Sequence, residues 1–112
     1  MLSKKYRFHS RGGVKYTYQK GKTVRTPKLS LIYAPNERGF QRFGVVISKK
    51  VLKSAVGRNR IRRRVYEIIR LHREQFPAKT DFIFIVYSKD LLTMPFEELS
   101  SLISQLLQES MI

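Results

Sequence analysis

The stretch 57–73, GRNRIRRRVYEIIRLHR, constrains the fold of this 112-residue chain more than any other segment. Its apolar residues at positions 61, 65, 68 and 69 have the spacing that places side chains on one face of an α-helix. On the opposite face we expect Asn59, Arg62, Arg63, Tyr66, Arg70 and Arg73. A guanidinium group is a planar fork of donors that fits phosphate oxygens. The stretch therefore predicts a helix with one side in a core and the other facing a polyanion.

The charge of the chain supports this interpretation. The formal net charge is +15, and residues 1–73 hold 21 of the 23 Lys and Arg with only two acids. Like charges also lie three and four residues apart in the helix, which costs a few tenths of a kcal/mol for each pair unless an anion relieves it. A domain this basic usually binds nucleic acid or an anionic membrane. We prefer nucleic acid because the apolar face is needed for the core.

Several classes are excluded or disfavoured. The chain has no cysteine, so it has no disulfide, thiolate metal site or cysteine nucleophile. No apolar run approaches the ~20 residues that span a bilayer, and the first residues, MLSKKYRFHSRGG, lack the apolar core of a secretory signal. We therefore expect a cytoplasmic protein that makes no membrane contact.

The order of patterns predicts an α+β fold. We expect a helix over about 10–19 that ends before Gly21, followed by a polar connection over 21–27. Two strands, at 28–34 and 41–48, should pair as a hairpin. The arginine-rich helix should be followed by a buried strand at 82–87 and by a last helix after Pro95. The order is helix, strand, strand, helix, strand, helix, with the helices on one face of a small mixed sheet. The unit 41–87 would make two strands parallel. Residues 1–112 would form one domain, with 1–11 as a basic arm.

A catalytic centre in the protein is not apparent. The only histidines are His9 and His72, and the basic region offers only Glu37 and Glu67 as carboxylates. We interpret Glu67 as an intrahelical partner of Arg70 and of Arg63 or Arg64. Metal-assisted nuclease chemistry needs carboxylates that lie close together. We therefore expect neither a catalytic nor a metal site in the protein.

Aromatic residues in or near the basic segments leave two interpretations open. Tyr16, Tyr18, Tyr33 and Tyr66 suit stacking on unpaired bases, but core packing is at least as good an explanation for each one alone.

The residues Lys49-Lys50, Ala55-Val56 and 58–63, RNRIRR, resemble the signature of the protein subunit of bacterial ribonuclease P. The resemblance extends over most of the chain. It implies a ribosomal-protein-like two-layer fold with a left-handed strand–helix–strand crossover. It also implies that the protein binds a large catalytic RNA, and that the complex removes the 5′ leader of precursor tRNA by hydrolysis. The active site and its Mg²⁺ would belong to the RNA, with no obligatory protein partner.

The resemblance also implies roles for individual residues. Those matching the RNA-binding signature are Lys49, Lys50, Lys53, Arg58, Asn59, Arg60, Arg62 and Arg63, to which we add Tyr66 and Arg70 from the same helix face. The cleft for the single-stranded leader would include Val14, Tyr18 and Ile32. Relatives often have aromatic residues in place of Val14 and Ile32, and many have arginine in place of Tyr66.

Two alternatives remain at this stage. One is a non-enzymatic RNA-binding module, such as a ribosomal or RNA-chaperone-like protein, which would share the fold. The other is a protein-only nuclease, which the position of the carboxylates disfavours.

Overall fold

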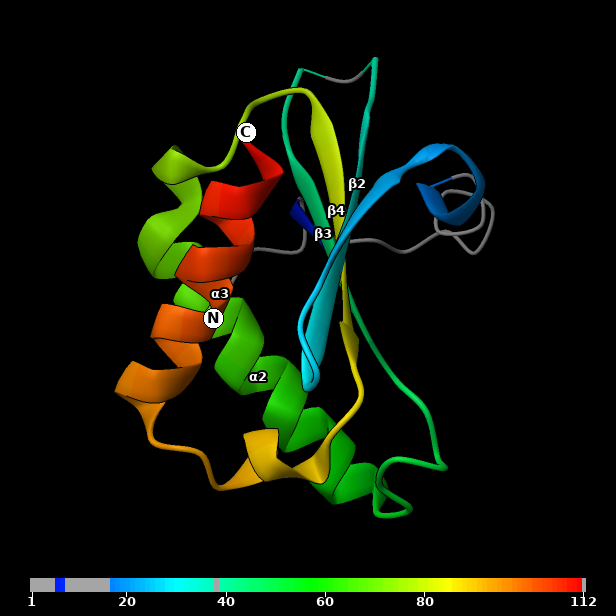
Figure 1. Ribbon diagram of the computed structural model, residues 1–112, viewed down its shortest axis with the longest axis vertical. Helices are drawn as coiled ribbons and strands as arrows, with labels where there is room; N and C mark the ends of the chain where they lie inside the picture. The colour runs from blue at the N-terminus through cyan, green and yellow to red at the C-terminus, as the bar shows by residue number, and fades with distance from the viewer. Residues whose placement is uncertain (1–5, 8–16, 38, 112) are drawn as a thin grey trace.

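The computed structural model describes residues 6–7, 17–37 and 39–111. Four strands form one mixed sheet in the order β1-β2-β4-β3. They are β1 (Lys22–Arg25), β2 (Leu29–Pro35), β3 (Arg42–Ile47) and β4 (Thr80–Val86). Helices α2 (Ala55–His72) and α3 (Phe96–Ser110) lie together on one face of the sheet (Figure 1). Short 3₁₀-helices, η2 (Arg73–Gln75) and η3 (Lys89–Leu92), follow α2 and β4.

The pairing of the strands confirms the α+β class and corrects one connection. β3 and β4 are parallel and are joined through α2, as expected, whereas β2 is antiparallel to both β1 and β4. The predicted hairpin between β2 and β3 is therefore wrong, because β4 lies between them. β4 is an almost continuous apolar strand that is buried on both faces, and such a strand is stable at the centre of a sheet rather than at its edge.

The strand β1 lies in the segment 21–27, which the sequence predicts as a connection. Its sequence, KTVR, has a single apolar residue, Val24, and is mostly exposed. Short, charged strands are typical of sheet edges, where they discourage pairing with other chains. The pattern of such a strand does not differ from that of a polar loop.

The core lies between the sheet and the two helices. Ile61, Val65, Ile68 and Ile69 of α2 are all fully buried, which confirms the predicted apolar face. They belong to one cluster with alternate residues of the strands, such as Leu31 and Phe84, and with the buried stripe of α3.

The opposite face of the sheet is covered in part by a helical turn at 17–20 (Figure 1). The expectation of helices on one face thus holds for α2 and α3 but not for this turn. It ends at Gly21, as predicted, while residues 10–16 lie outside the described residues. A Cβ at Gly21 would come within 2.4 Å of the Thr17 carbonyl oxygen and 2.7 Å of Ile32 Cγ2. Glycine is therefore required where the turn approaches β2.

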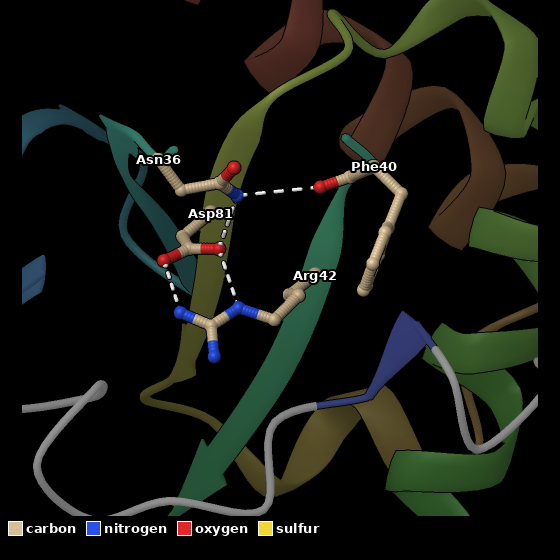
Figure 2. A network of polar contacts seen from close by, with 4 residues as sticks. All are labelled: Asn36, Phe40, Arg42 and Asp81. Carbon is tan, nitrogen blue, oxygen red and sulfur yellow. Dashed lines mark hydrogen bonds and ion pairs between the residues drawn. The ribbon is translucent and has the colours of Figure 1, made fainter. Parts of the chain in front are cut away.

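A buried ion pair holds the beginnings of β3 and β4 together (Figure 2). Arg42 donates from Nε and Nη2 to the two carboxylate oxygens of Asp81, at 2.9 and 2.7 Å. Asn36 Nδ2 donates to Asp81 Oδ1 at 2.7 Å and to the Phe40 carbonyl at 3.3 Å. Asp81 is only 2 % exposed, so these donors replace water around its charge.

Within the described ranges, no helix is long and apolar enough to span a bilayer.

We predict that Asp81→Asn lowers the free energy of unfolding by about 3–5 kcal/mol, because it removes the negative charge that balances the mostly buried Arg42 guanidinium. Urea denaturation followed by circular dichroism measures the change. Asp90→Asn is the matched control, since the Lys28–Asp90 pair is exposed and should contribute at most about 1 kcal/mol. Equal effects of the two substitutions would contradict a structural role for the buried pair.

Candidate nucleic-acid interface

The loop before α2 is bound tightly to the first turn of the helix. Ser54 Oγ accepts a hydrogen bond from the Gly57 amide at 3.0 Å and caps the helix. Arg58 Nη1 donates back to the carbonyls of Leu52 and Lys53, at 2.8 and 2.7 Å. A Cβ at Gly57 would lie 2.8 Å from Leu52 Cδ2, so this glycine allows the close approach. The loop is thereby positioned by contacts with the helix.

This anchoring places positive charge at the amino end of α2. Lys49, Lys50 and Lys53 of the loop are all exposed, and the first turn of α2 contains no acidic residue. The amino end of a helix already has a partial positive charge and unpaired N–H groups. Additional lysines there are unfavourable unless an anion binds, so the arrangement suits a phosphate group.

The exposed basic residues continue from this loop along α2. We define the basic surface as the exposed side chains of Lys49, Lys50, Lys53, Asn59, Arg60, Arg63 and Arg70, with the half-buried Arg58 and Arg62. Arg62 Nη1 donates to Asn59 Oδ1 at 3.0 Å, which orients both side chains. The structure thus brings together nearly all of the residues predicted to bind RNA.

Arg64 has a different role from its neighbours. It donates from Nη1 to the Leu91 carbonyl and from Nη2 to the Met94 carbonyl. These contacts join the middle of α2 to η3 and to the connection that leads into α3. Position 64 lies three residues after Ile61 and four before Ile68. The helical spacing alone could therefore have predicted that Arg64 lies beside the apolar face.

Glu67 partly neutralises the basic surface near the end of the helix. Its Oε1 accepts from Arg70 Nη2 at 2.6 Å and from Arg70 Nε at 3.1 Å. The Arg70 guanidinium lowers the pKa of Glu67 from 4.5 to about 2, so the carboxylate is ionised at neutral pH. The predicted partnership with Arg70 is confirmed. Arg64, which was one of the two other candidates, binds η3 instead.

Tyr66 is not on the exposed helix face, contrary to expectation. It is only 9 % exposed and belongs to the core cluster. The backbone of Val45 donates to its phenol oxygen, and burial raises its pKa in spite of nearby Arg7 and Arg62. Its ring centre lies 5.9 Å from the guanidinium carbon of Arg7. Tyr66 therefore contacts the edge strand β3 from within the protein.

The reason for this difference is a segment far away in the sequence. Arg7 forms an isolated bridge with Phe43 of β3, so residues 6–7 cover the flank of α2 that faces this edge. Arg73 also lies on this flank, with its guanidinium carbon 4.2 Å from the ring centre of Tyr6. A helical wheel of α2 alone cannot show such a covering layer.

The face of the sheet opposite α2 and α3, which we call the open face, has a pair of exposed tyrosines. Tyr18 of the helical turn is 41 % exposed and Tyr87 is 44 % exposed. The pKa of Tyr18 is raised first by partial burial and then by the nearby Tyr87. The sequence-based set of site residues omits Tyr87, although it continues the alternation of Asp81, Ile83 and Ile85 and so lies on this face.

The other two predicted cleft residues differ from Tyr18. Ile32 is only 6 % exposed because Gly21 and the helical turn lie over it. Val14 is outside the described residues. Among the residues that the structure describes, the exposed aromatic side chains on this face are therefore Tyr18 and Tyr87.

The basic surface has no chemistry suited to a metal ion. Over the ranges that the structure describes, no three His, Asp or Glu side chains gather in a way that could hold one. The guanidinium and ammonium groups of this surface are donors, and they repel cations.

Comparison with known proteins now identifies the family. The family model named Ribonuclease P matches residues 2–110 of this chain. The chain belongs to the ribonuclease P protein family. The ribonuclease P protein component of Roseiflexus castenholzii is 36 % identical over 109 residues, which are 97 % of this chain and 88 % of the relative. That of Chloroflexus aurantiacus is 38 % identical over 92 residues, 82 % of this chain and 67 % of the relative.

Solved structures of ribonuclease P proteins share the fold. The Staphylococcus aureus protein superposes with a TM-score of 0.82 at 24 % identity, covering 94 % of each chain. The Thermotoga maritima protein gives a TM-score of 0.81 at 23 % identity, covering 92 % of this chain and 96 % of the other.

From its family, the chain is a subunit of ribonuclease P, the ribonucleoprotein endoribonuclease of tRNA processing, and its partner is RNA. Catalysis in this family is expected from the RNA.

We predict that Arg64→Ala lowers the free energy of unfolding by about 2–3 kcal/mol, because the charged donor serves two carbonyls that would lose their partner. Arg63→Ala, one position earlier on the exposed side, should change it by less than about 0.5 kcal/mol. Urea denaturation of both variants makes the comparison. Equal stability of the two would show that the contacts of Arg64 with η3 are not structural.

Proposed function

We propose that the basic surface binds the catalytic RNA of ribonuclease P. The observation that carries this proposal is the continuous exposed row formed by the anchored loop and the outer face of α2. The candidate contacts are Lys49, Lys50, Lys53, Arg58, Asn59, Arg60, Arg62, Arg63 and Arg70. Tyr66 would support this surface from within instead of touching RNA.

The charge on this surface suggests how the protein assists cleavage. Folding a large RNA brings phosphates together, and Lys and Arg relieve their repulsion while releasing bound counterions. We therefore propose that the Mg²⁺ required for hydrolysis is held mainly by the RNA, and that the protein lowers the Mg²⁺ concentration at which the complex is active. The complex would act in the cytoplasm without an obligatory protein partner.

We further propose that the open face of the sheet binds the 5′ leader of precursor tRNA. Exposed aromatic rings beside basic groups bind single strands by stacking on successive bases. Within the described part of the chain, Tyr18 and Tyr87 are rings so placed. Val14 and Ile32 belong to the cleft by family resemblance; with Ile32 buried, stacking would fall on the two tyrosines.

Reconstitution with a bacterial ribonuclease P RNA at low Mg²⁺ tests the main proposal. Adding the wild-type protein should increase the rate of leader removal. We predict that Arg63→Ala and Asn59→Ala weaken binding to the RNA. Arg63→Ala should lower the affinity by about 10- to 150-fold, because a charged hydrogen bond contributes about 1.5–3 kcal/mol. The slope of log affinity against log salt should become shallower by about 0.7–0.9 for each phosphate that the variant no longer neutralises.

Lys89→Ala serves as the charge control, since Lys89 is exposed in η3 and outside the basic surface. If Arg63→Ala and Asn59→Ala both bind the catalytic RNA as tightly as the wild-type protein does, these assignments are ruled out. Sequencing the RNA that co-purifies with the tagged protein separates the ribozyme from ribosomal RNA as the partner.

We predict that Tyr18→Ala and Tyr87→Ala each weaken binding of precursor tRNA by about 1–3 kcal/mol, the usual contribution of one stacked base. Binding of mature tRNA and of the catalytic RNA should change little. Dissociation constants of the reconstituted complex for precursor and mature tRNA measure the difference. Phe96→Ala removes an exposed ring from the helix side of the molecule and is the control. A similar loss for mature tRNA would contradict leader stacking.

A further inference from the structure

A separate pocket lies at the end of the sheet where β2 finishes and β4 begins. Its volume is about 240 Å³, and it is lined by residues from the helical turn at 17–20, from β1, from β2, from β4 and the loop before it, and from the end of α3. It contains none of the residues of the basic surface and neither Tyr18 nor Tyr87. It is therefore a site that the proposed RNA and leader contacts do not use.

Two lysines make the rim of this pocket positive. Lys20 and Lys22 both line it and both are exposed. Among the residues that the structure describes, neither lysine takes part in an ion pair. Two nearby ammonium groups without a counterion repel each other, and an anion at the rim would relieve that repulsion.

The walls of the pocket are largely apolar. Tyr33, Pro35 and Pro77 contribute rings to the lining. The volume is smaller than the roughly 300–1,000 Å³ typical of sites for drug-sized ligands. A single planar group, such as a nucleobase, is the kind of ligand that this space and these rings suit.

Two hydroxyl groups among the lining residues, those of Thr80 and Ser110, favour hydrogen-bond donors on the ligand. Thr80 Oγ1 donates to the Ala78 carbonyl at 3.0 Å, and Ser110 Oγ donates to the Leu107 carbonyl at 2.6 Å. Because both hydroxyl protons are engaged, these oxygens remain available only as acceptors. An exocyclic amine of adenine, cytosine or guanine is a donor that matches them.

We propose that this pocket binds one nucleotide of single-stranded RNA, with its base inside and its phosphate on Lys20 and Lys22. The inference rests on the proposed leader-binding function and extends it. Lys20 lies in the same helical turn as Tyr18, so a strand that stacks on Tyr18 can follow this turn around the β1 edge to the pocket. The occupant is therefore a leader nucleotide farther from the cleavage site than those at the two tyrosines.

The test uses the double variant Lys20→Ala/Lys22→Ala in the reconstituted complex. Precursors with leaders of increasing length are compared by their dissociation constants. The wild-type complex should gain affinity, by about five- to tenfold, at the leader length that first reaches the pocket. The double variant should lack this gain and should bind shorter leaders as tightly as the wild type does. For long leaders, the slope of log affinity against log salt should be shallower in the double variant by about 0.7, the value for one phosphate of a single strand.

Lys28→Ala/Lys89→Ala is the matched control. It removes the same charge at the opposite end of the sheet, where the Tyr87 amide donates to the Lys28 carbonyl. Because this charge lies near Tyr87, any loss of affinity should already appear with the shorter leaders, and the gain at the pocket length should remain. All four lysines are at least partly exposed, so we expect both double variants to fold, and thermal denaturation checks this.

A second measurement asks whether the base is bound. An abasic residue at the leader position where the gain appears should weaken wild-type binding and should not weaken the pocket variant further. Normal long-leader binding by the pocket variant would overturn the proposal, as would an equal loss for mature tRNA. If the wild-type complex did not prefer precursor to mature tRNA at all, the leader-binding function would fail together with the pocket. If the wild-type complex prefers precursor tRNA and the pocket variant keeps the full gain for long leaders, the pocket alone is overturned.

Discussion

The packing of α2 on the sheet is the interaction on which the rest of this structure depends. Four side chains of the helix, Ile61, Val65, Ile68 and Ile69, are fully buried, and each contributes about 1.5–3 kcal/mol by leaving water. A like-charge pair on the outer face costs only about 0.2–0.5 kcal/mol. Burial of one face can therefore support a density of positive charge on the other that an isolated helix would not tolerate. The helix presents this charge as a rigid row.

The arginines of α2 differ in function because they meet different neighbours. Arg58 and Arg64 donate to backbone carbonyls of the preceding loop and of the η3 region, so they stabilise the elements that flank the helix. Arg60 and Arg63 are exposed and remain available to phosphate. The run of similar residues thus combines structural support with exposed positive charge, and only the positions of carbonyl groups distinguish the two kinds of arginine.

Tyr66 illustrates how the basic surface can depend on an uncharged residue. Its phenol oxygen accepts a hydrogen bond from the backbone of β3, the strand at the end of the sheet. Arginine has no acceptor atom and could not do this. The tyrosine therefore joins α2 to the sheet edge at a position where, by family resemblance, many relatives have another charge.

The sequence by itself determined the apolar face of α2, the buried strand β4, the parallel relation of β3 and β4, the glycine after the first helical turn and the excess of positive charge. These follow from local spacing and composition. Only the tertiary structure decided that β4 separates β2 from β3, that Arg64 turns inward, that residues 6–7 cover Tyr66, and that Tyr18 and Tyr87 lie near each other. Each of these depends on contacts between segments far apart in the chain, and a helical or strand period contains no information about which distant segment will lie against a given face.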